Sequence, residues 1–182
     1  MQLTRLEQVL FEVDWDEFER HIIQMTTSIP SAFQALSPAH STERISQVSI
    51  WTDVAARVSA INLETIEHAR IANITHAQWL RTHDFNDEAD IVSQSSKSLN
   101  PAGFLYPRVV ECYHPELEVI HDHLASDESI KIADQFISEK LRIIRQEIIE
   151  TGLLHALPHE DPVWFGVSSD NDWYDHEIAA TL

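Results

Sequence analysis

Residues 126–152 have the sequence SDESIKIADQFISEKLRIIRQEIIETG, which carries the clearest structural signal in the chain. Apolar residues recur there at steps of three and four, the spacing that gathers side chains on one face of a helix. These residues are Ile130, Ala133, Ile137, Leu141, Ile144 and Ile148. Gly152 follows the last of them, at the position where a glycine commonly ends a helix. The pattern predicts a helix over 127–151 that lies at the centre of the core.

Helical spacing also dominates the chain that precedes this segment. Asp14 and Glu17 have the spacing of a capping box, and they predict a helix that runs to about Ser28. Two further helical stretches are expected over 42–60 and 62–81, where apolar residues recur at the same steps. The periodicity leaves open whether these two stretches form one bent helix or several short ones.

Three other parts of the chain lack this regularity. Residues 83–103 are acidic and serine-rich and end in turn-forming residues, which is typical of a mobile polar surface loop. Between Pro107 and Pro115 there is room for a short helix only. Residues 153–182 predict an irregular tail, in which the run 163–167 suits one short strand.

Together these patterns predict a mainly α fold. We expect one domain over residues 1–182, built as a bundle of about six to eight helices. The polar loop at 83–103 and the acidic, aromatic tail at 153–182 would lie outside the regular part of this bundle.

The composition limits what the protein can bind. The chain has 182 residues, with 12 Lys and Arg against 30 Asp and Glu, so its formal net charge is -18. Nucleic acid and anionic membranes need a basic surface, and both are therefore excluded as partners. A strong negative field instead steers cationic partners toward the protein.

The single cysteine and the N-terminus point to the cytoplasm. Cys112 is the only cysteine, so no disulfide can form within the chain. It stands in an apolar stretch, which is typical of a buried and inert thiol, although His114 lies two residues away. The first residues show neither a basic region nor an apolar block, so no signal peptide is expected.

Metal binding is the strongest catalytic hypothesis that the sequence offers. With three glycines, the chain has no room for glycine-rich nucleotide loops, and it lacks the motifs of nucleophile-elbow hydrolases. Glu118 and His121 form a Glu-x-x-His pair, and Glu64 and His68 lie four residues apart. Such spacing places both side chains on one helix face, as in metal-binding bundles. A divalent iron, manganese or zinc ion is therefore the alternative to a protein without cofactor.

A candidate binding surface lies in the C-terminal tail. Residues 146–182 contain eight acidic residues and no Lys or Arg. Carboxylates among large aromatic side chains suit a basic protein partner, because charge steers the encounter and aromatic rings anchor it. The predicted contact residues are Glu160, Asp161, Asp170, Asp172, Trp173, Tyr174, Asp175 and Glu177.

Two functions therefore follow from the sequence. The favoured one is a small acidic cytoplasmic binding protein without catalysis, such as an immunity or antitoxin-type inhibitor that neutralises a basic partner protein. The alternative is a metal-dependent helical enzyme that uses Glu64, His68, Glu118 and His121. Pairing of two copies through the helix at 127–151 would fit either function.

Overall fold

A five-stranded mixed sheet is the centre of the computed structural model, so the protein is an α/β protein and the prediction of a mainly α bundle is wrong. The structure describes residues 5–36, 43–98, 100–168 and 177–182. The helices are α1 Arg5–Leu10, α2 Trp15–Thr27, α3 Ile29–Leu36, α4 Ile66–Thr82, α5 Asn86–Gln94, α6 Glu118–His121 and α7 Asp127–Thr151, with 3-10 helices η2 Pro101–Gly103 and η3 Pro115–Leu117. The strands are β1 Ile45–Asp53, β2 Val58–Thr65, β3 Tyr106–Tyr113, β4 His159–Ser168 and β5 Ile178–Ala180.

The strands lie in the order β3-β2-β1-β4-β5. β1 pairs with β4 in parallel, whereas the β1–β2, β2–β3 and β4–β5 pairs are antiparallel. Because β1 and β4 are parallel, the chain must cross over between them, and α7 lies in this connection.

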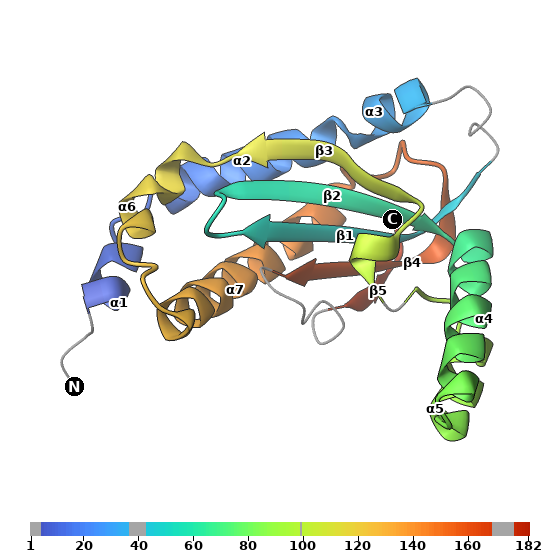
Figure 1. Ribbon diagram of the computed structural model, residues 1–182. Coiled ribbons are helices and arrows are strands. Elements are labelled where there is room, and N and C mark those ends of the chain that lie inside the picture. The colour runs from blue at the N-terminus through green and yellow to red at the C-terminus, as the bar shows by residue number, and fades with distance from the viewer. Residues whose placement is uncertain (1–4, 37–42, 99, 169–176) are drawn as a thin grey trace.

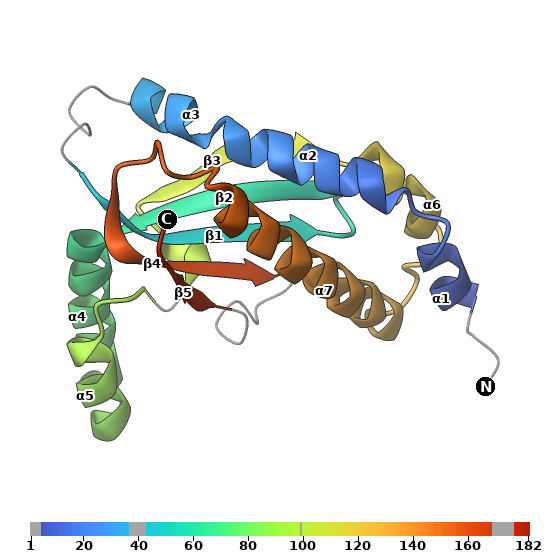
Figure 2. The ribbon, with the colours of Figure 1, turned by 180° about the vertical axis from the view of Figure 1, so that it is seen from behind.

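One face of the sheet carries the hydrophobic core. α2 and α7 cover this face, and Figure 2 shows both helices in front of the strands. Side chains alternate between the faces of a strand, so Val48 and Ile50 of β1 point into the core together with Phe165 of β4. Each such fully buried side chain contributes roughly 1.5–3 kcal/mol to the free energy of unfolding.

The opposite face of the sheet is buried but polar. Figure 1 shows η2 lying over this face, which neither α2 nor α7 covers. We call it the polar face, because the strand side chains that alternate with the core residues include Gln47, Ser49, Asn62, Glu64 and Ser168, all of them buried.

α2 and α7 begin and end as their sequences predict. The side chain of Asp14 accepts a hydrogen bond from the backbone N–H of Glu17 at the start of α2. Ser126 caps α7 in a reciprocal capping box, and Gly152 ends it in a left-handed conformation with φ of 68°. Both predicted helices are confirmed. They could be predicted because their capping signals lie within a few residues of the helix ends in the sequence.

Three other segments differ from the prediction. Residues 45–65 form the β1–β2 hairpin where a helix was expected. The segment between Pro107 and Pro115 belongs mostly to strand β3 instead of forming a short helix, and Pro107 itself lies within that strand. The predicted loop at 83–103 contains α5 and η2. The strand expected at 163–167 is confirmed as part of β4.

α4 and α5 form a helical hairpin that stands apart from the main core. α4 follows β2 directly, and both helices extend beyond the end of the sheet (Figures 1 and 2). The hairpin has a small core of its own, made by Ala77, Ala89 and Val92 with Leu80 packed against them. Among the described residues, no helix has both the length and the hydrophobicity that a membrane crossing would need.

Candidate functional site

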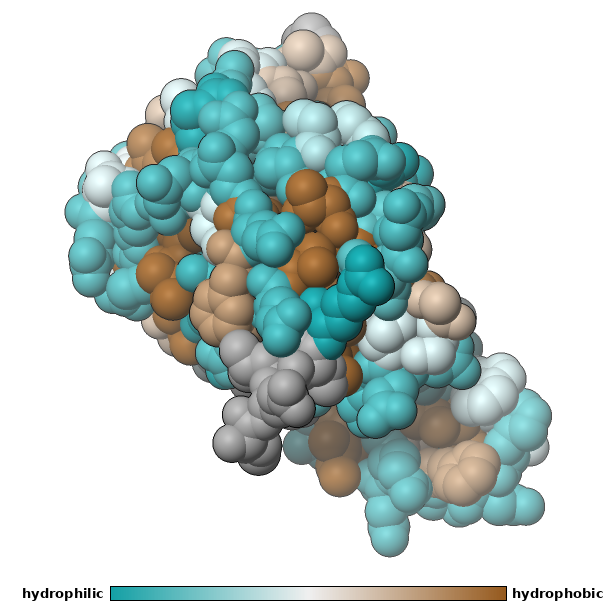
Figure 3. Space-filling model, turned by 90° about the vertical axis from the view of Figure 1, so that its left-hand side faces the viewer, coloured by the Kyte–Doolittle hydropathy of each residue, from teal (hydrophilic) through white to brown (hydrophobic). Residues whose placement is uncertain are grey.

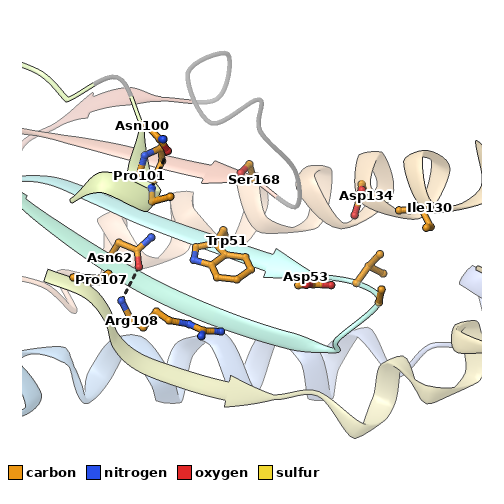
Figure 4. Close-up of a pocket in the computed structure, with 13 residues that line it drawn as sticks. Trp51, Asp53, Asn62, Asn100, Pro101, Pro107, Arg108, Ile130, Asp134 and Ser168 are labelled. Carbon is orange, nitrogen blue, oxygen red and sulfur yellow. Dashed lines mark hydrogen bonds between the residues drawn. The ribbon is translucent and has the colours of Figure 1, made fainter. Parts of the chain in front are cut away.

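A pocket of about 630 Å³ opens on the polar face. Its walls come from β1, β2 and the start of β3, from η2, and from the first part of α7 (Figure 4). The polar lining residues include Asp53, Asn62, Asn100, Arg108 and Asp134. Ser168, the last residue of β4, lines another edge of the pocket.

Arg108 shapes the middle of this pocket. Its backbone N–H donates a hydrogen bond of 2.7 Å to the side-chain oxygen of Asn62, drawn as a dashed line in Figure 4. Its φ of 53° is unusual for a residue with a side chain, and it occurs where the pairing of β3 with β2 shifts register. The guanidinium lies 5.7 Å from the centre of the Trp51 ring and forms an ion pair with Glu111. The pocket thus presents charged groups of both signs and an indole ring, with which a ligand could form ion pairs and stacking contacts.

A second polar network lies on the same face. Glu177 forms an ion pair of 2.7 Å with Lys97, and the Lys97 ammonium lies 3.6 Å from the centre of the Trp164 ring. Gln47 accepts the backbone N–H of Ser98 and donates to Glu177. Burial raises the pKa of Glu177, and the hydrogen bonds from Lys97 and Gln47 oppose this rise. The network fastens the segment around residue 97 to the sheet.

A chain of hydrogen bonds runs through the core side of the sheet. His114 Nε2 lies 2.7 Å from the Ser59 hydroxyl, and His114 Nδ1 lies 2.7 Å from a Glu116 oxygen. The same Glu116 oxygen lies 3.2 Å from Nδ1 of His21 on α2. Burial lowers the pKa of His114, while the contact with Glu116 opposes this shift. One hydroxyl, two imidazoles and one carboxylate are thus connected by consecutive contacts.

The Ser59–His114–Glu116 connection resembles the order of groups in a serine hydrolase triad. A catalytic serine must meet its substrate, whereas Ser59 is fully buried. Its hydroxyl also lies 2.6 Å from that of Thr52, and Ser59 does not line the pocket on the polar face. The three residues therefore build the core and offer no accessible nucleophile.

Cys112 lies beside this cluster. It is partly exposed, and burial is the main cause of the raised pKa of its thiol, to which the nearby Glu116 adds. A raised pKa lowers the thiolate fraction at neutral pH, so Cys112 is a poor nucleophile as the sequence suggested. His114 does not activate it, because both nitrogens of that imidazole have other partners.

The four predicted metal ligands lie as two separate pairs. Glu64 and His68 contact each other at 2.9 Å where β2 ends and α4 begins. Glu118 and His121 lie on α6, and Glu118 forms an ion pair with Arg57, which precedes β2. β2 separates the pairs by roughly 20 Å, at about 3.3 Å per residue. The structure does not bring the four residues into one site.

The predicted tail residues fall into three groups. Asp161 is exposed and Glu160 is partly exposed at the start of β4. Glu177 has a side chain only 3% exposed, which places it inside the network with Lys97. The others lie outside the described residues, namely Asp170, Asp172, Trp173, Tyr174 and Asp175.

A surface that the sequence did not single out lies on the α4–α5 hairpin. Five large apolar side chains are about half exposed or more there, and we call this set the hairpin surface. They are Ile71 at 54%, Ile74 at 51%, Trp79 at 54%, Phe85 at 49% and Ile91 at 73%. In Figure 3 the hairpin projects from the body at the lower right, with hydrophobic residues among hydrophilic ones. The sequence signal for this surface was the apolar content of residues 66–94, and a helix buried in the core would have the same apolar content.

The hairpin also carries more acidic than basic residues. The exposed carboxylates of the hairpin are Glu67, Asp84, Asp87, Glu88 and Asp90. Only two residues of the hairpin are Lys or Arg, and one of these, Arg81, is paired with Asp90. The hairpin thus combines exposed apolar and aromatic side chains with an excess of negative charge.

The chain matches no known family model, and no curated protein or solved structure shows significant similarity to it.

Proposed function

We propose that the chain is an acidic binding protein that holds a basic protein partner through the hairpin surface. The observation that carries this proposal is the exposure of Ile71, Ile74, Trp79, Phe85 and Ile91 on one projecting element. Large exposed apolar patches with polar rims mark sites of protein–protein contact. Tryptophan is also one of the residues that most often dominate the energy of such contacts.

The charge of the hairpin supports a basic partner. Its five exposed carboxylates outnumber its two arginines, in a chain of net charge -18. A negatively charged surface attracts a cationic surface and repels an acidic one, which affects both the association rate and the choice of partner. A basic protein is therefore the occupant that this surface fits.

The proposed biological role is that of an immunity or antitoxin-type inhibitor in the cytoplasm. A nuclease needs a cationic active site to hold phosphate, and a carboxylate-rich surface can block such a site. The metal-dependent enzyme is the weaker candidate, because Glu64 and His68 lie at the opposite end of β2 from Glu118 and His121.

Capture of the partner with matched variants tests this function. The tagged full chain is used as bait in a lysate of its own host, and captured proteins are identified by mass spectrometry. The wild type should retain a basic protein, and Trp79→Ala combined with Ile74→Ser should lose it. Ile143→Ser is the matched control, because Ile143 is 65% exposed on α7, away from the hairpin. This control should retain the same protein.

Two results would contradict the proposal. In the first, the hairpin variant folds normally and still binds the captured basic protein with wild-type affinity. In the second, the purified wild type forms a stable dimer whose contacts cover the hairpin surface, so that a second copy is its partner. Light scattering coupled to gel filtration distinguishes this outcome, because the hairpin variant would then become a monomer.

A further inference from the structure

Three potential metal ligands converge between α2 and the end of β3, and a carboxylate lies beside two of them. His21 lies on α2, while Cys112, His114 and Glu116 lie at the end of β3 and in the residues that follow. One ligand atom from each of His21, Cys112 and His114 lies within 4.8 Å of the others. Glu116 lies beside the two histidines of this group, because one of its oxygens lies 2.7 Å from Nδ1 of His114 and 3.2 Å from Nδ1 of His21.

The carboxylate of Glu116 is incompletely satisfied. Its side chain is only 3% exposed, and its second oxygen is buried without a hydrogen-bond partner. A buried carboxylate oxygen without a partner is costly, since it has lost its hydration and gained nothing in return. The two imidazoles share its other oxygen, so the carboxylate keeps one oxygen free to contact a bound cation.

In both imidazoles, the Nε2 nitrogen also contacts a polar group of the protein. Nε2 of His114 contacts the Ser59 hydroxyl, which in turn lies 2.6 Å from the hydroxyl of Thr52. Nε2 of His21 lies 2.9 Å from a guanidinium nitrogen of Arg20 and 3.2 Å from a carboxylate oxygen of Glu17. When Nδ1 of His21 binds a metal, Nε2 carries the proton, so the contact with Glu17 replaces the one with Arg20. Metal-binding histidines are characteristically held in this way, with the nitrogen that does not bind the metal fixed by an oxygen of the protein.

We propose that Nδ1 of His21, Nδ1 of His114, Sγ of Cys112 and the carboxylate of Glu116 bind one zinc ion. Two imidazoles, a thiolate and a carboxylate form a tetrahedral zinc donor set, and the sulfur disfavours magnesium and calcium. Zinc binds its ligands at about 2.0–2.3 Å, so neighbouring donors must come to roughly 3.3–3.8 Å from one another. The thiol of Cys112 gives up its proton to solvent on binding.

The site would be structural. Four protein ligands fill a tetrahedral zinc ion and leave no position for a substrate. The ion would join α2 to the end of β3, and thus fasten the N-terminal helices to the sheet. This inference goes beyond the proposed partner function and does not depend on it.

Zinc and cobalt titrations of the metal-free full-length protein test the site. The wild type should bind one zinc ion per chain and melt at a higher temperature when zinc is added. Cobalt in the same site should show the intense near-ultraviolet band of a thiolate–cobalt bond. Cys112→Ser should abolish this band, and it should weaken zinc binding by at least about tenfold. His21→Gln, which keeps the thiol, should weaken zinc binding to a similar extent.

Three control variants locate the metal. His76→Gln changes an exposed histidine on the hairpin, while His68→Gln and His121→Gln change two metal ligands predicted from the sequence. All three should bind zinc as the wild type does. The assignment is overturned if the wild type does not bind zinc at micromolar concentration, or if bound cobalt lacks the thiolate band. It is also overturned if Cys112→Ser keeps wild-type affinity for zinc while His68→Gln or His121→Gln loses it.

Discussion

The ammonium group of Lys97 lies 2.7 Å from a carboxylate oxygen of Glu177, on the polar face of the sheet. These residues are 80 positions apart in the chain. The ring of Trp164 on β4 lies beside them, with its centre 3.6 Å from the ammonium nitrogen. The side chain of Glu177 is 3% exposed and that of Lys97 is 29% exposed. The ion pair therefore connects the residue that directly precedes β5 to the segment that follows α5.

Removing the cation should destabilise the protein. Among the described residues, Lys97→Met leaves the buried carboxylate of Glu177 with Gln47 as its hydrogen-bond partner, and we expect a loss of about 1–3 kcal/mol in the free energy of unfolding. Urea denaturation measures this loss. Lys131→Met, at an exposed lysine on α7, is the matched control and should change stability by less than about 0.5 kcal/mol. Equal stability of the two variants would show that the ion pair contributes nothing.

Glu64 should make stability depend on pH. Burial raises the pKa of Glu64 above its ordinary value of 4.5, although His68 and the backbone N–H of Thr65 oppose the rise. The folded state thus holds this proton more tightly than the unfolded chain does. The resulting stabilisation is complete below pH 4.5 and is lost as pH rises through the raised pKa.

Glu64→Gln isolates this effect, because the amide mimics the protonated carboxyl at every pH. The free energy of unfolding of the variant relative to the wild type should increase as pH rises from 4.5 toward 7. Urea denaturation at several pH values measures the difference, and the same substitution at the exposed Glu67 controls for the introduced amide. A difference that stays constant or decreases over this range would contradict the prediction.

Gly152 should not tolerate a side chain. Its φ is 68°, and a Cβ atom there would lie 2.6 Å from an atom of the His155 ring. Gly152→Ala should therefore cost about 1–2 kcal/mol, measured by thermal or urea denaturation. Gly103 is the matched control, because a Cβ atom added there meets no atom within 4 Å. A cost at Gly103 as large as at Gly152 would argue against the left-handed helix end.

Local signals explain which parts of the fold could be predicted. α2 and α7 carry their caps and apolar stripes within a few residues of sequence. The β1–β2 hairpin was mistaken for a helix because Val48, Trp51 and Val54 happen to have helical spacing. Val48 and Ile50 in fact alternate with Ser49 and Trp51, as a strand requires. Polar residues buried on the second face made this alternation hard to distinguish from a surface helix.

Long-range contacts explain what could not be predicted at the candidate sites. His21 and Glu116 are 95 positions apart and meet only because α2 packs near the end of β3. Trp79 and Ile74 fit a helical pattern in the sequence, but periodicity does not say whether the helix has a neighbour on that face. Which apolar residues remain exposed is decided by the placement of the whole hairpin.

The association rate of the captured basic partner tests the central claim most directly. Stopped-flow mixing at low salt would compare the wild type with Asp84→Asn, Asp87→Asn and Glu88→Gln combined, and with Glu160→Gln and Asp161→Asn combined. We expect the hairpin changes to slow association by about tenfold, the tail changes to alter it by less than about twofold, and physiological salt to remove most of the difference. A wild-type rate that is insensitive to salt, or a rate that falls with the tail changes but not with the hairpin changes, would contradict binding through the hairpin surface.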